Sequence, residues 1–143
     1  MEHPKPIKVL IVEDNPDDQE LLRLQLRKTT FFDGTLFLDD PLKALDLIQG
    51  AHSEELKENL VAILLDVNLP HMSGIDLLRI LRTTEGLERV PVMVMTSCPH
   101  PNVRASCEEL KVTAFVEKPV TISDFAKIIA SVFHPTPLAA RSR

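Results

Sequence analysis

Short apolar runs rich in β-branched residues alternate along the chain with segments that carry helix signals. This alternation is typical of βα repeats, in which helices cover both faces of a parallel sheet. The runs have three to six residues, which suits strands that are buried on both sides. We therefore predict an α/β fold with a doubly wound, five-stranded parallel sheet, whose strands lie at 7–12, 35–38, 61–65, 92–95 and 114–116.

The helix signals between these runs are local and have a physical cause. In Asn15-Pro16 and Asp40-Pro41, a side chain that can cap a helix precedes a proline, which suits the first helical position. A capping-box pattern at 121–124 precedes apolar residues that recur on one helical face. That face comprises Phe125, Ile128, Ile129, Val132 and Phe133. We expect a helix to begin at each of these three points.

The size and charge of the chain limit what it can be. With 143 residues, 44% of them apolar, it can bury one sizeable core, so we expect one domain at 1–134 and a tail at 135–143. A formal charge of −5 argues against non-specific binding to nucleic acid or anionic membrane. No secretory or membrane-spanning apolar run is present. We expect a cytoplasmic protein that has protein partners.

Charged and hydroxyl residues stand where four of the predicted strands end. They are Glu13 and Asp14 after the first strand, Asp66 after the third, Thr96 after the fourth and Lys118 after the fifth. Because the carboxyl ends of parallel strands lie along one edge of a sheet, we expect these side chains to meet there. Three carboxylates would repel one another by about 4 kcal/mol per pair at ~4 Å and an effective dielectric of about 20. A cation should offset that repulsion.

Each of these residues alone has a structural explanation as a helix cap, a turn residue or a solvated charge. Their joint placement points instead to a phosphoryl site. Mg²⁺ prefers oxygen ligands and uses one or two carboxylates together with water and phosphate oxygens. An aspartate beside Mg²⁺ can form an aspartyl phosphate, while Lys118 supplies a point charge and Thr96 a hydrogen bond.

Four segments resemble the motifs of the receiver domains of two-component response regulators. They are V-E-D-N-P-D-D (12–18), L-L-D-V-N-L-P-H-M-S-G (64–74), M-T-S (95–97) and F-V-E-K-P (115–119). The likeness runs from about Lys8 to Phe133, and the order and spacing of all four segments agree. It implies a flavodoxin-like sheet with the strand order 2-1-3-4-5 and a stand-alone response regulator that signals through protein contacts.

The resemblance assigns roles to the residues of the strand ends. Asp66 is the phosphoacceptor, and Asp14 and Asp66 bind Mg²⁺ together with the backbone carbonyl of Asn68. Glu13 binds the ion directly or through water. Thr96 and Lys118 contact the phosphoryl oxygens. We expect no dedicated hydrolase, because Asn68 stands where an aspartyl phosphatase would need a second acid. The chain would only assist its own phosphorylation and dephosphorylation.

Further positions follow from the same resemblance. Phe115 falls at the aromatic switch position that is coupled to Thr96, although a buried core aromatic explains it as well. The bond between Lys118 and Pro119 is expected to be cis, and Gly74 to have a positive φ. Two prolines within 98–101 depart from the usual pattern and should delay the next helix.

More closely, E-D-N-P-D-D, N-L-P-H-M-S-G and V-E-K-P-V-T-I-S-D-F are similar to small single-domain regulators that partner bacterial phytochrome histidine kinases. This likeness implies a sensor histidine kinase of the phytochrome type as the partner. The tail at 135–143 is either disordered or an arm of a homodimer that also uses the last two helices. The alternative function is a receiver-like interaction module that needs no phosphate.

Overall fold

The structure, a computed structural model, describes residues 6–133. The tail at 135–143, and with it the predicted dimer arm, lies outside the described residues. Five strands form one parallel sheet in the predicted order β2-β1-β3-β4-β5. They are β1 (Val9–Val12), β2 (Thr35–Leu38), β3 (Ala62–Asp66), β4 (Val92–Thr96) and β5 (Ala114–Glu117). The predicted strands are confirmed with end shifts of one or two residues.

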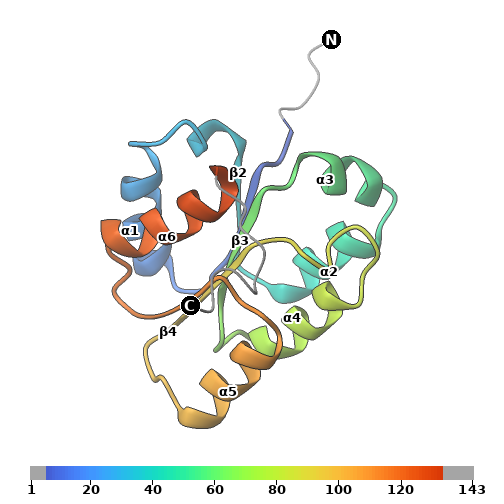
Figure 1. Cartoon of the computed structure of the whole chain (residues 1–143). Helices are drawn as coiled ribbons and strands as arrows, with labels where there is room; N and C mark the ends of the chain where they lie inside the picture. The colour runs from blue at the N-terminus through green and yellow to red at the C-terminus, as the bar shows by residue number, and fades with distance from the viewer. Residues whose placement is uncertain (1–5, 134–143) are drawn as a thin grey trace.

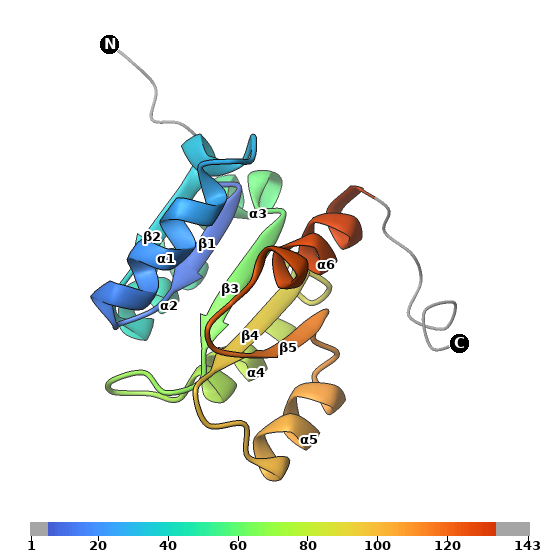
Figure 2. The same ribbon diagram turned by 90° about the vertical axis from the view of Figure 1, so that its left-hand side faces the viewer.

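Helices cover both faces of the sheet, as predicted (Figures 1 and 2). On one face lie α1 (Pro16–Leu26) and α6 (Ile122–Phe133). On the other lie α2 (Pro41–Gln49), α3 (Ser53–Asn59), α4 (Gly74–Arg82) and α5 (Pro101–Glu109). A short 3-10 turn at Phe32–Gly34 precedes β2. Among residues 6–133, no helix has the length and apolar character needed to cross a bilayer.

Alternate residues of the central strands enter two separate cores, because successive side chains of a strand point to opposite faces. Leu10 and Ile63 pack toward α2 and α4, whereas Ile11 and Leu64 pack toward α1 and α6. All four are buried. Burial of such a side chain stabilises the fold by roughly 1.5–3 kcal/mol. The well-packed central strands therefore fix the positions of the polar residues at their carboxyl ends.

The helix starts have the predicted caps. Asn15 Oδ1 accepts hydrogen bonds from the backbone N–H groups of Asp17 (2.9 Å) and Asp18 (3.1 Å). Asp40 caps α2 in the same way, and a reciprocal pair of hydrogen bonds between residues 121 and 124 starts α6. Phe125 and Ile128 of α6 are buried as predicted. The side chains of Ile129, Val132 and Phe133 lie outside the described part of the chain.

The prediction that Gly74 has a positive φ was wrong. Gly74 is the first residue of α4, and the positive-φ glycine of the described residues is Gly86 instead. A Cβ atom on Gly74 would lie 2.0 Å from the backbone oxygen of Asp66. The site therefore needs glycine for close backbone approach. Pro101, one of the two prolines within 98–101, is the first residue of α5, and the expected delay of this helix stays a prediction.

Candidate functional site

The carboxyl ends of the strands bring three acidic side chains together. Glu13 and Asp14 follow β1, and Asp66 is the last residue of β3. Each offers a carboxylate oxygen, and these oxygens lie within 4.8 Å of one another. The parallel pairing of β1 with β3 sets this geometry, because it holds Val12 beside Leu65. We call Glu13, Asp14 and Asp66 the acidic triad.

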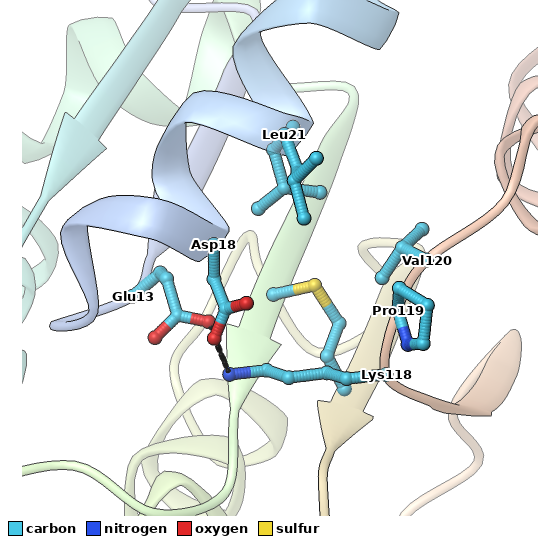
Figure 3. A pocket seen from close by; sticks show the side chains of 8 residues that line it. Glu13, Asp18, Leu21, Lys118, Pro119 and Val120 are labelled. Atoms are coloured by element: carbon cyan, nitrogen blue, oxygen red, sulfur yellow. Dashed lines mark hydrogen bonds and ion pairs between the residues drawn. The ribbon is translucent and has the colours of Figure 1, made fainter.

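Lys118, directly after β5, extends its ammonium group toward Glu13 of the triad and toward Asp18 of α1 (Figure 3). Its Nζ lies 2.9 Å from Asp66 Oδ2, 2.7 Å from Asp18 Oδ2 and 2.5 Å from Glu13 Oε1. The first two contacts are hydrogen bonds. The contact with Glu13 is an ion pair without hydrogen-bond alignment, since Oε1 has no hydrogen-bond partner among the described residues. One lysine thus counters three negative charges.

Burial makes the charge of Glu13 costly. Glu13 is fully buried, and this burial raises the pKa of its carboxyl from 4.5 to about 7, although Lys118 and the N–H of Asn15 favour the ionised form. Burial alone would lower the pKa of the Lys118 ammonium. The contacts with the carboxylates of Asp18, Glu13 and Asp66 outweigh that effect and raise the pKa of Lys118. The lysine is therefore charged at neutral pH.

The donor set fits a hard divalent cation. The triad offers only oxygen ligands, and Asp14 is exposed to solvent. Glu13 Oε1 is buried and accepts no hydrogen bond from residues 6–133. Mg²⁺ accepts such oxygens and keeps water in its remaining positions. The backbone N–H of Asn68 donates to Asp66 Oδ1 at 3.1 Å, which fixes the carboxylate. A role for the Asn68 carbonyl as a ligand stays a prediction.

Thr96 lies on β4, the strand next to that of Asp66, and Phe115 lies on β5, one strand further out. Thr96 ends β4 and is fully buried, and its Oγ1 accepts a hydrogen bond from the backbone N–H of Cys98 at 3.1 Å. Phe115 on β5 is half-buried. The guanidinium carbon of Arg104 lies 4.9 Å from the centroid of its ring, which is within the range of a cation–π contact. The ring is therefore in contact with α5.

The sequence profile of the response regulator receiver domain family matches residues 9–130. The chain belongs to this family. Among curated relatives of this receiver domain, response regulator Rcp1 of Synechocystis sp. is 30% identical over 129 residues, which cover 89% of this chain and 86% of Rcp1.

Solved structures of response regulators, among them regulators named for bacteriophytochromes, share the fold of this receiver domain. The bacteriophytochrome response regulator AtBRR is 31% identical, with a TM-score of 0.73 over 94% of this chain and 98% of AtBRR. The Mn²⁺-bound form of response regulator Rcp1 is 29% identical, with a TM-score of 0.72 over 92% of this chain and 97% of that one. The predicted likeness to phytochrome-associated regulators is confirmed.

Sequence reasoning about this receiver domain missed one residue of the site. Asp18 lies in the first turn of α1 and hydrogen bonds to Lys118, a hundred residues away in the chain. An acid in a first helical turn is already explained by the helix dipole, so its type gave no signal of a contact. The predicted cis peptide bond between Lys118 and Pro119 is present.

Proposed function

We propose that this receiver domain is a stand-alone response regulator that accepts a phosphoryl group on Asp66 from a sensor histidine kinase. The observation that carries the proposal is the position of Asp66. Its carboxylate belongs to the acidic triad and also hydrogen bonds to Lys118 at 2.9 Å. A nucleophilic carboxylate, a cation site and a lysine in one place are what phosphoryl transfer to an aspartate requires.

In the proposed reaction, a carboxylate oxygen of Asp66 attacks the phosphorus of a phosphohistidine. The new O–P bond forms as the N–P bond to the imidazole breaks, and the imidazole leaves with the electron pair and takes up a proton from water. Lys118 would move from Asp66 Oδ2 to the oxygens of the transferred group, whose charge it neutralises. The buried hydroxyl of Thr96 would donate a hydrogen bond to the same group.

We identify the expected cation as Mg²⁺. It would be held by Glu13, Asp14, Asp66 and the backbone carbonyl of Asn68. When bound, the ion would neutralise negative charge on the transferred phosphoryl group. The oxygen-only donor set supports this assignment. So does the Mn²⁺-bound form of Rcp1, because Mn²⁺ and Mg²⁺ prefer the same hard oxygen ligands.

We further propose that the kinase is of the phytochrome type, and that the signal leaves through protein contacts of this regulator in the cytoplasm. The likeness to the bacteriophytochrome response regulators AtBRR and RtBRR supports the first point. The same likeness motivates a homodimer that uses α5, α6 and the tail at 135–143.

Thr96 and Phe115 would carry the switch that responds to phosphorylation. Phe115 has no hydroxyl, so its inward motion would have to exchange the contact with Arg104 for new packing.

Acetyl phosphate with Mg²⁺ tests the function without the kinase. The wild type should gain one phosphoryl group by intact mass, and Asp66→Asn should gain none, because the carboxamide is not a nucleophile for this reaction. Asp66→Asn keeps the size of the side chain, and far-UV circular dichroism checks its fold. Equal labelling of both proteins would reject Asp66 as the acceptor. No labelling of the wild type would favour the phosphate-independent interaction module.

A further inference from the structure

The carboxylates around Lys118 have different roles in the proposed function. Glu13 and Asp66 belong to the acidic triad, where the cation and the phosphoryl group would bind. Asp18 lies outside the triad, on α1, and its Oδ2 accepts a hydrogen bond from Lys118 Nζ at 2.7 Å (Figure 3). We propose that Asp18 is a positioning residue that holds Lys118 at the phosphoryl site. The inference rests on the proposed function of Asp66.

Asp18 is placed to hold an ammonium group firmly. Its backbone N–H donates to the capping side chain of Asn15 at 3.1 Å, which fixes the first turn of α1. Its side chain is 28% exposed, whereas that of Lys118 is 12% exposed and that of Glu13 is 0% exposed. Because Asp18 keeps contact with water, its charge costs less desolvation than that of Glu13. It can therefore remain a charged partner of the lysine.

The other two contacts of Lys118 weaken when the site is used. A phosphoryl group on Asp66 would occupy the carboxylate that accepts a hydrogen bond from Lys118 Nζ at 2.9 Å. A cation bound to the triad repels the ammonium from Glu13, whose Oε1 lies 2.5 Å from Nζ. Asp18 is then the remaining carboxylate of the three. Asp18 would keep the long, flexible side chain of Lys118 directed at the oxygens of the phosphoryl group, where negative charge develops.

A competing role for Asp18 would have the opposite sign. If Asp18 drew Lys118 away from the phosphoryl group, removal of its carboxylate would speed phosphorylation. The geometry favours positioning, because Asp18 and Asp66 accept hydrogen bonds from the same Nζ at once. An ammonium group has three hydrogens to donate, so the contact with Asp18 still leaves donors for the phosphoryl oxygens.

The initial rate of phosphorylation by acetyl phosphate tests the inference. Asp18→Ala should slow the reaction roughly tenfold, the scale of one charge-assisted hydrogen bond. Asp18→Asn keeps an acceptor oxygen and should lose less. Asp17→Ala is the matched control, because it removes the same charge from the same helical turn. Among the described residues, the exposed Asp17 side chain has no hydrogen bond or ion pair, so its removal should leave the rate unchanged.

A double-mutant cycle with Lys118→Ala shows whether Asp18 acts through the lysine. In the Lys118→Ala background, Asp18→Ala should have no further effect on the rate. A rate that is unchanged or faster in Asp18→Ala alone, or an equal slowing in both backgrounds, would overturn the inference. If the wild type itself takes no label, the proposed function fails rather than the role of Asp18.

Mn²⁺ binding to the unphosphorylated protein gives a readout that needs no phosphoryl transfer. Without Asp18, the ammonium should remain on Glu13 and compete with the ion there. We expect Asp18→Ala to weaken Mn²⁺ binding, measured by calorimetry, roughly three- to tenfold on the same hydrogen-bond scale. In the Lys118→Ala background the loss should disappear. A loss of equal size in Lys118→Ala, or no loss at all, would contradict a role of Asp18 through Lys118.

Discussion

The buried carboxyl of Glu13 should make the wild type less stable as pH rises, and Glu13→Gln should remove this effect. Glu13 is fully buried beside Asp66, and its ionised form is only partly compensated by Lys118. A glutamine has nearly the same shape and carries no charge at any pH. The difference in free energy of unfolding between the two proteins therefore isolates the ionisation of one carboxyl group.

The size and sign of the effect follow from the pKa of Glu13. Its pKa rises from 4.5 to about 7 in the folded protein, so the folded state binds this proton more tightly than the unfolded state does. The stability contributed by protonated Glu13 is fully present below pH 4.5 and is lost as pH rises through about 7. Above that pH the ionised carboxylate costs about 3 kcal/mol. Glu13→Gln should then be the more stable protein by about this amount.

Urea unfolding followed by far-UV circular dichroism measures the difference, because the chain has no Trp or Tyr for fluorescence. The stabilities should be similar near pH 4.5 and should separate between about pH 5 and pH 8. The control is Glu117→Gln, because Glu117 is exposed and adjacent to Lys118 in the chain. The stability of this variant should follow that of the wild type at each pH. Mg²⁺ should stabilise the wild type more than Glu13→Gln. A variant less stable than the wild type at about pH 8 without Mg²⁺ would refute the reasoning, since the buried ion pair would then be net stabilising.

Two further predictions concern the backbone under the site and the tail. Gly74→Ala should lower the free energy of unfolding by about 1–3 kcal/mol, because the added Cβ would lie 2.0 Å from the carbonyl oxygen of Asp66. Urea unfolding measures this loss, and an unchanged unfolding midpoint would contradict the close approach. Removal of 135–143 should convert a dimer to a monomer by light scattering, and an oligomeric state that does not change would argue against the dimer arm.

The architecture could be predicted because it depends on local patterns. Apolar runs such as the one at 92–95 are short, contain β-branched residues and are separated by capped helices, and few folds besides a doubly wound sheet can bury them all. The site followed from the same pattern, since parallel strands bring their carboxyl ends to one edge. Glu13, Asp66 and Lys118 were therefore placed together before any geometry was known.

What could not be predicted depends on contacts between distant segments. Asp18 meets Lys118 because the long side chain of Lys118 reaches from the end of β5 to the first turn of α1, and the helix dipole already accounted for an acid in that turn. Gly74 was selected correctly, but its cause is the approach of α4 to the carbonyl oxygen of Asp66. The contact of Arg104 with Phe115 likewise joins α5 to β5. None of these packing distances has a local signature in the sequence.

The chemical position of the phosphoryl group tests the central claim most directly. An acyl phosphate is reduced by borohydride to an alcohol, so protein treated with acetyl phosphate and Mg²⁺ and then with borohydride should contain homoserine at position 66. Peptide mass spectrometry identifies the reduced residue. We predict reduction at Asp66 alone, and none when Mg²⁺ is withheld. Reduction at Asp14 or Asp18 instead, or a phosphoryl group that resists borohydride, would contradict the account.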